Sequence, residues 1–441
     1  MKRPADSKNT KRYGLIAGWG NYPVLIARAL KKAGHQVFCL GVTGLADSKS
    51  LKDLCDVYRE MGLARFGAAC RFFRKSGVTE ATMGGKVFKK ELLRPGVIWR
   101  HLPDPYTFCS FFSLFFSRRK DMKDDTLLQA AARAFERRGI HFLPATDLVP
   151  NLLIASGTLT CRRFSETDQL DICQGWQLAR EIGRLDFGQD VTIRNGTILS
   201  VEGIDGTDET ILRGRADGSG KPFMVIKVAK PNQDMRFDVP AVGVGTLRRM
   251  AEAGADRLVL EAERTLCVDP LEEFIAEADA LGIAVAAVQE LELSLKPVTS
   301  LSSVLPKFRP LTKGALSEKE IKDIQFGLPV LFSMERFSVG AAVTIRERSV
   351  LAVASMTEPL SAILERSRRF APDGFTLFFG SPFGKPDALL TAESLTSIKQ
   401  SGVRLLVLRA GFLETDRDLL IQAAEKARLT IVEIDTLVRE S

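Results

Sequence analysis

Short apolar runs alternate with amphipathic segments along the first third of the chain. The runs 13–17 and 36–41 predict buried strands, and the spacing of apolar side chains over 24–33 predicts a helix that ends at Gly34. Strand, glycine-rich turn, helix and strand in this order are typical of a Rossmann-like domain built on a parallel sheet. The same pattern continues with helices at 64–76 and 126–138 and strands at 80–84 and 140–143.

A second set of elements follows Pro150 and Gly157. The segment 165–185 is helical in pattern, and 190–201 predicts a hairpin because Asn195-Gly196 separates two alternating runs. Strands at 223–228 and 257–260 and helices at 245–253 and 270–281 complete a second α/β domain.

The last part of the chain repeats the apolar pattern of this second domain. Three segments recur in order, with most of their polar residues lost: 187–194 as 339–346, 198–201 as 350–353, and 253–262 as 401–410. The repeat predicts a degenerate copy of the second domain. We therefore expect a Rossmann-like nucleotide-binding domain (12–150), a linker (151–168), a catalytic α/β domain (169–292), a second linker (293–320) and the degenerate repeat (321–441).

Composition narrows the partners and the compartment. The 441 residues carry a net charge of +8, which favours anionic partners, and no nucleic-acid-binding signature is present, so we expect none of these partners to be a nucleic acid. Neither a secretory signal nor a membrane-spanning run is found. The seven cysteines form no CxxC pair, which favours a reduced, cytoplasmic protein. The three histidines have no metal-ligand spacing, which favours structural or exposed positions over catalytic ones.

Two glycine-rich turns could hold a phosphate. One contains Gly18, Gly20 and Asn21 before a helix, and the other contains Gly84 and Gly85 after a strand, followed by Lys86. Small residues allow close approach of the backbone, and a helix N-terminus favours an anion. A tight turn or loop without a ligand explains both segments as well.

Acidic residues stand before the helix at 126–138. Asp124 and Asp125 could meet substrate hydroxyls or a metal ion, but an N-cap explains at least one of them. Nearby, the phenylalanine-rich run 106–116 precedes basic residues. That run is either a buried helix or a surface for acyl chains or a membrane.

The most specific segment is the loop 227–240. It follows a strand and contains Lys227, Lys230, Arg236 and the two carboxylates Asp234 and Asp238. Such alternation of sign suits a hydrated divalent cation and a diphosphate, because Mg²⁺ prefers one or two carboxylates and substrate oxygens. Neighbouring loops could add the further acids Asp190, Glu202 and Asp205. Asp205-Gly206 is equally well explained as a plain turn.

Together these segments resemble the LpxI family of UDP-2,3-diacylglucosamine pyrophosphatases. The matching residues run in family order over roughly residues 12–292: 14–18 with Pro23, 83–85, 124–128, 188–189, 202–208 and 230–240. Trp19 and Lys123 depart from the family pattern and bear on the fit of the substrate. Residues 293–441 lie beyond the usual family length.

The resemblance implies hydrolysis of UDP-2,3-diacylglucosamine to 2,3-diacylglucosamine 1-phosphate (lipid X) and UMP in lipid A biosynthesis. It also implies a lipid substrate held between two domains, dependence on Mg²⁺ or another divalent cation, and attack of water on the β-phosphate. Asp234 and Asp238 are the candidate metal ligand and general base, in an order left open, and Arg236 and Lys230 complete the catalytic set. The candidate substrate-binding residues are Gly18, Gly20, Asn21, Gly84, Gly85, Lys86, Asp124, Asp125, Gln189, Thr207, Lys227 and Gln233.

Such a substrate predicts peripheral association with the anionic face of the inner membrane. We expect the repeat to cover the catalytic unit or to mediate assembly, and the protein to be a homo-oligomer, for example a dimer. Two other functions remain open at this point. A nicotinamide-dependent oxidoreductase could share the N-terminal fold, although Pro23 interrupts the glycine turn and no acidic residue ends the second strand. The repeat could also belong to a scaffold without catalysis.

Overall fold

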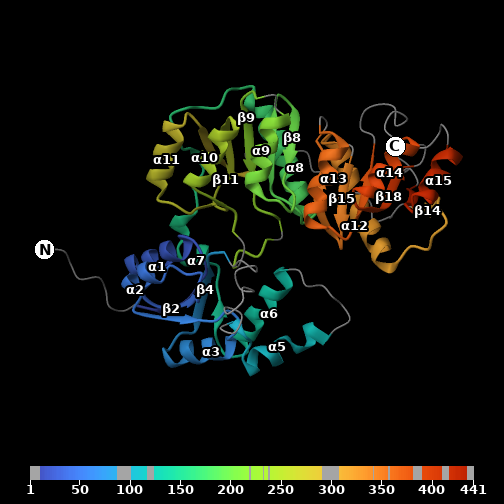
Figure 1. Ribbon diagram of the computed structural model, residues 1–441. Coiled ribbons are helices and arrows are strands. Elements are labelled where there is room, and N and C mark those ends of the chain that lie inside the picture. The colour runs from blue at the N-terminus through green and yellow to red at the C-terminus, as the bar shows by residue number, and fades with distance from the viewer. Residues whose placement is uncertain are drawn as a thin grey trace. The chain divides into compact units, whose positions relative to one another are not determined.

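The computed structural model describes residues 10–86, 101–116, 124–217, 220–231, 233–236, 239–290, 307–340, 342–355, 358–380, 390–409 and 417–434, without the side chains of 112–116, 124–127 and 217. The chain forms two compact units (Figure 1). Unit 1 contains residues 1–154, 233–243 and 264–271, and unit 2 contains 155–232, 244–263 and 272–441.

Unit 1 is built on a five-stranded sheet in the order β3-β2-β1-β4-β5. All four strand pairs are parallel, as in a Rossmann-like domain. Its elements are β1 (Arg12–Ala17), α1 (Tyr22–Lys32), β2 (Gln36–Val42), α2 (Ser48–Leu54), β3 (Val57–Met61), α3 (Phe66–Lys75), β4 (Glu80–Gly84), α5 (Pro105–Phe116), α6 (Asp124–Glu136), β5 (His141–Phe142), α7 (Ala145–Leu148), the 3₁₀ turn Pro150–Leu152, and the short parallel pair β10 (Ala241–Val242) and β12 (Leu266–Cys267).

Helices cover both faces of this sheet because successive side chains of a strand point to opposite sides. In β2, Val37 belongs to the core formed with α1 and α2, while Phe38 belongs to the core formed with α3 and α6. Figure 1 shows α1 and α2 on one side of the sheet and α3 on the other. The predicted parallel-sheet domain is confirmed.

Unit 2 contains a six-stranded sheet in the order β6-β13-β11-β9-β7-β8. Strands β9, β11 and β13 are parallel. Antiparallel β6 at one edge and the hairpin β7–β8 at the other complete a mixed sheet. The elements are β6 (Gly157–Thr158), α8 (Asp168–Arg184), β7 (Asp190–Arg194), β8 (Thr197–Val201), α9 (Thr207–Asp217), β9 (Phe223–Lys227), α10 (Val244–Ala253), β11 (Ala255–Glu261), α11 (Leu271–Ala280) and β13 (Ala284–Val288).

A further six-stranded sheet in unit 2 has the corresponding order β14-β19-β18-β17-β15-β16. Its strand pairs match those of the second sheet in direction, including the antiparallel hairpin. The elements are β14 (Phe308–Pro310), α12 (Glu318–Arg336), β15 (Ala342–Arg346), β16 (Ser349–Val353), α13 (Leu360–Phe370), β17 (Phe375–Phe379), α14 (Ala392–Gln400), β18 (Val403–Arg409), α15 (Arg417–Lys426) and β19 (Thr430–Ile434).

The hairpin β7–β8 has the turn that its sequence predicts. Asn195 and Gly196 both have positive φ, at 48° and 73°, which suits the right-handed twist of the flanking strands. The buried carboxylate of Asp171 in α8 accepts hydrogen bonds from the N–H groups of both turn residues, at 2.8 and 2.6 Å. Asp323 in α12 accepts the corresponding bonds from the turn between β15 and β16.

Two expectations for the helices α5 and α6 are changed. Helix α6 is described from Asp124 on, so both aspartates lie in its first turn and not before the helix as expected. Residues 121–123 lie outside the described residues, so the expected N-cap stays a prediction. The side chains of both aspartates lie outside the described residues. In α5, Phe111 is buried while Phe108 is 47% exposed, so this helix has a buried face and keeps an apolar side chain on the surface.

Within the described residues, every helix is too short or too polar to span a lipid bilayer.

Removing the carboxylate of Asp171 should destabilise unit 2. Asp171→Ala leaves two backbone N–H groups of the hairpin turn without their acceptor. We expect a loss of about 1–3 kcal/mol in the free energy of unfolding, measured by urea denaturation. Asp323→Ala is the matched variant and should cost a similar amount. A loss below about 0.5 kcal/mol in both would contradict this role of the two carboxylates.

Candidate functional site

Charged side chains gather where the central strands of the second sheet end. Strands β9 and β11 are parallel and finish at Lys227 and Glu261, and β7 runs the opposite way and begins at Asp190, directly beside Lys227. All three side chains are buried, with residue exposures of 3% for Lys227, 0% for Asp190 and 4% for Glu261. The carboxyl edge of parallel strands is where α/β proteins place their binding sites.

Lys227 and Asp190 form a buried ion pair. The Nζ of Lys227 lies 2.9 Å and 2.8 Å from the two carboxylate oxygens of Asp190. The hydroxyl of Thr207, the first residue of α9, donates a hydrogen bond to Asp190 and lies 3.1 Å from the same Nζ. A buried ion pair of this kind contributes little net stability, because removing two charges from water costs about as much as their attraction returns.

A second carboxylate stands beside the ion pair. Glu202 accepts a hydrogen bond of 2.8 Å from the backbone N–H of Gln189, and the Thr207 hydroxyl lies 3.3 Å from its other oxygen. Burial and the negative charge of Asp190 raise the pKa of Glu202 to about 7. A carboxyl group that titrates near neutrality is common at functional sites because it can exchange a proton there.

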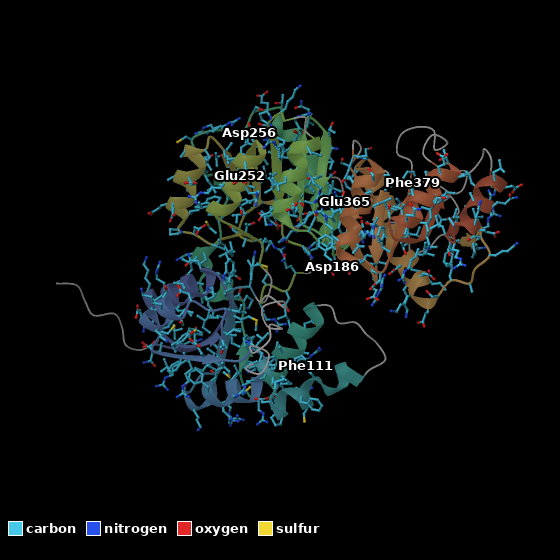
Figure 2. The ribbon with its side chains drawn as sticks, viewed as in Figure 1. Phe111, Asp186, Glu252, Asp256, Glu365 and Phe379 are labelled. Carbon is cyan, nitrogen blue, oxygen red and sulfur yellow. The ribbon has the colours of Figure 1, made fainter. Side chains whose placement is uncertain are left out.

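The third sheet lacks these polar residues at the corresponding positions. Ala342 and Phe379 are register partners in β15 and β17, as Asp190 and Lys227 are in β7 and β9. Both are buried, and Figure 2 marks Phe379. Ala354 follows β16 as Glu202 follows β8. The end of β18 has an ion pair of its own, between Arg409 and Glu335. The same strand arrangement nevertheless forms without counterparts of Asp190, Glu202 and Lys227, so these three residues are not required for the strand order.

Glu261 is a buried acid that the sequence interpretation missed. One carboxylate oxygen accepts a hydrogen bond of 2.7 Å from the N–H of Ala229, and the other lies 3.3 Å from Arg180 of α8. It therefore fixes the chain just after β9, where the charged loop begins. Its place at the end of a predicted strand was the signal that could have found it.

Residues of the charged loop after β9 form two separate ion pairs, one with a partner outside the loop and one within it. Lys230 lies in unit 2, where its Nζ is 3.0 Å from a carboxylate oxygen of Asp186 (marked in Figure 2). Asp234 lies in unit 1, where Nε and an Nη of Arg236 donate hydrogen bonds of 2.9 and 2.7 Å to its two oxygens. These bonds hold the pKa of Asp234 below its usual value.

Several predicted site residues lie outside the described part of the chain. Asp238, predicted as metal ligand or general base, is one of them, together with the side chains of Asp124 and Asp125. Gln233 is described and is partly buried in unit 1.

The two glycine-rich turns of unit 1 lie side by side. The N–H of Gly18 donates to the carbonyl of Gly84, and Trp19 and Lys86 exchange two backbone hydrogen bonds of 2.9 Å. A Cβ on Gly85 would stand 2.7 Å from the Trp19 carbonyl oxygen, so close packing of the turns by itself requires glycine there. Gly20 has a φ of 102° and open space around it.

The predicted set thus falls into two groups. Asn21, whose side chain donates to the Val268 carbonyl at 3.1 Å, belongs to unit 1 with the glycine turns, Gln233, Asp234 and Arg236. Gln189, Thr207, Lys227 and Lys230 belong to unit 2. Among the residues that the structure describes, no group of three histidine, cysteine or acidic side chains could hold a metal ion.

Comparison with known proteins decides the family. Sequence models of the LpxI N-terminal and C-terminal domains match residues 12–152 and 155–286. The UDP-2,3-diacylglucosamine pyrophosphatase LpxI of Caulobacter vibrioides is 31% identical over 293 residues, which cover 99% of that protein and 64% of this chain. The chain belongs to the LpxI family. The third sheet begins after the end of the C-terminal domain match, so it lies outside both LpxI domain matches.

The raised pKa of Glu202 predicts a pH dependence of stability in this LpxI-family chain. The folded state favours the neutral carboxyl, so the stabilisation is complete below the ordinary pKa of 4.5 and is lost as the pH rises through about 7. Compared with Glu202→Gln, which does not titrate, the wild type should therefore lose unfolding free energy between about pH 5 and about pH 8. Urea denaturation at both pH values measures this difference. Parallel pH profiles of the two proteins would show that Glu202 titrates normally.

Proposed function

We propose that this chain hydrolyses the diphosphate of UDP-2,3-diacylglucosamine and releases 2,3-diacylglucosamine 1-phosphate and UMP, with water attacking the β-phosphate. The observation that carries the proposal is the similarity to the Caulobacter pyrophosphatase over 99% of its length, through both LpxI domains. The charged edge of the second sheet and the loop that leaves it support the proposal, because a diphosphate needs cationic and acidic partners.

Asp234 suits the role of metal ligand better than that of general base. Its pKa is held low by Arg236, so the carboxylate stays ionised at neutral pH and has little tendency to accept a proton. Arg236 donates four hydrogen bonds of 2.7–3.2 Å to the two oxygens, three from its guanidinium group and one from its backbone N–H. The guanidinium group would have to turn away, towards a phosphate, to free the carboxylate for a metal ion. In this assignment Asp238, the second acid of the loop, is the candidate general base.

The Asp234 carboxylate fits a Mg²⁺ ion that keeps most of its shell as water and substrate oxygens. This ion is commonly bound by one or two carboxylates, with waters and substrate oxygens completing its shell, so a cage of three protein acids is not needed. Asp234 would hold it. When bound, the ion would supply polarisation of the diphosphate.

The three basic residues of the loop have different tasks in this proposal. Arg236 and Lys230 are partly exposed and can turn towards phosphate oxygens from their present acidic partners. Lys227 is buried against Asp190, so we now place it as a positioning residue and not, as its sequence context suggested, in contact with substrate. With Asp190 and Thr207 it fixes the strand end from which the loop starts.

We also propose that residues 321–441 are a degenerate copy of the second domain and carry no chemistry. The support is the shared strand order together with Ala342, Ala354 and Phe379, which stand where the second sheet has Asp190, Glu202 and Lys227. The segment 381–389, which follows β17 as the charged loop follows β9, lies outside the described residues.

Access to a lipid substrate suggests a peripheral contact with the membrane surface. In this proposal helix α5 contributes the exposed Phe108, and the net positive charge favours anionic lipid. A peripheral contact of this kind needs no membrane-spanning helix.

The reaction predicts a defined set of products. Purified protein with Mg²⁺ should release UMP from UDP-2,3-diacylglucosamine, and a chelator should abolish the release. In ¹⁸O-labelled water the label should appear in the phosphate of the lipid product, because water attacks the β-phosphate, and mass spectrometry of both products locates it. Label in UMP would contradict that site of attack.

The acidic loop predicts a loss of rate without a loss of fold. Asp234→Asn and Asp238→Asn should each retain the circular dichroism spectrum of the wild type, and at least one should lose about a hundredfold or more in kcat. Glu365→Gln is the matched control, because this exposed carboxylate of α13 belongs to the degenerate copy (Figure 2) and should leave kcat unchanged. Wild-type rates in both loop variants would place the chemistry elsewhere.

A further inference from the structure

The two six-stranded modules of unit 2 share one hydrophobic core. We refer to residues 157–288 as the second module and 307–434 as the third module. A single cluster of buried side chains includes Ile172 and Trp176 of α8, Ile324 and Leu328 of α12, and apolar residues from both sheets. Each module buries the face that carries its long first helix, so matching surfaces of the two modules meet.

Polar contacts at this interface join equivalent positions. Glu181 and Ser333 each stand three residues before the arginine that ends its helix, α8 or α12. The Ser333 hydroxyl donates a buried hydrogen bond of 2.7 Å to the Glu181 carboxylate. Contact of a position with its own equivalent occurs on the axis of a twofold arrangement. Burial alone would raise the pKa of Glu181, but hydrogen bonds from Arg184 and Ser333 outweigh it and hold the pKa low.

Two arginines at equivalent positions of the two modules make a second set of contacts with the same twofold relation. Arg213 and Arg366 are each the seventh residue of an eleven-residue helix, α9 or α13. Arg213 pairs with Asp205 and donates to the carbonyl of the last residue of β8, and Arg366 pairs with Glu358 and donates to the carbonyl of the last residue of β16. The two pairs meet across the interface, where the Arg366 Nε lies 3.9 Å from the Asp205 carboxylate.

This arrangement is that of an isologous homodimer, in which the same surface of two identical subunits meets about a twofold axis. Here both halves belong to one chain. We propose that the third module occupies the surface through which the second module would otherwise bind a second copy of itself, so the chain is an internal pseudo-dimer. This inference does not rest on the proposed catalytic function. It also replaces, for this surface, the expected homodimer with a contact within one chain.

The proposal explains why the third module is retained although it lacks counterparts of Asp190, Glu202 and Lys227. A module whose long-helix face is apolar, with residues such as Trp176 at 0% exposure, would expose that face if the third module were absent. An apolar surface of this kind has to be covered. The third module retains the residues that cover it, among them Ile324 and Arg366, while the residues of the charged network are replaced.

Cross-linking between equivalent positions tests the proposal on the full-length chain. Glu181→Cys with Ser333→Cys is introduced after the exposed Cys109 and Cys161 are changed to serine. Chains with normal and heavy isotopes are mixed after purification, incubated, oxidised under mild conditions so that adjacent thiols are cross-linked as a disulfide, and digested. We expect a 181–333 cross-link in which both peptides carry the same isotope label, because the contact lies within one chain.

A second pair keeps the test independent of one variant. Asp205→Cys with Arg366→Cys removes one acid and one base, so Arg213 and Glu358 remain to balance each other. It should give the same intrachain cross-link. Mixed-isotope cross-links amounting to about half of the total at either pair would place the contact between chains and overturn the proposal. Absence of both cross-links from folded protein would overturn it as well.

Discussion

The ammonium group of Lys227 is buried at the end of strand β9, where water cannot solvate it, and the residues of the site are arranged around this charge. Asp190 neutralises it from the neighbouring strand, Thr207 binds both groups, and Glu202 stands beside them with a raised pKa. Removing one partner of such a pair would leave an uncompensated buried charge, which costs about 3–5 kcal/mol. The strand end that precedes the loop with Asp234 is therefore fixed by charge as well as by packing.

Comparison of the second sheet with the third supports a functional role for the charged residues. Two sheets with the same strand order and the same clamp on the hairpin turn differ at the charged edge, where Ala342 and Phe379 stand in place of Asp190 and Lys227. Features common to both modules are explained by the fold, and features confined to one are candidates for function. The interface between the modules belongs to the first class and the charged network to the second.

Much of the fold followed from the sequence, because local rules determine it. The Asn195-Gly196 turn and the apolar runs of both domains predicted elements that the structure confirms. The site followed less completely. Asp190 and Glu202 were noted only as further acids, because no local pattern shows that Asp190 is the register partner of Lys227 across two strands. Glu181 and Ser333 likewise meet through tertiary packing, which the spacing of residues along the chain does not record.

The central claim is that the buried ion pair serves the reaction and not the fold. Its most direct test is the double variant Asp190→Ala with Lys227→Phe, which gives the second sheet the residues that the third sheet has at these two positions. We expect the double variant to unfold at a higher urea concentration than Lys227→Phe alone, since no unpaired carboxylate remains, while hydrolysis falls by about a hundredfold or more. A double variant with the rate of the wild type would contradict the account.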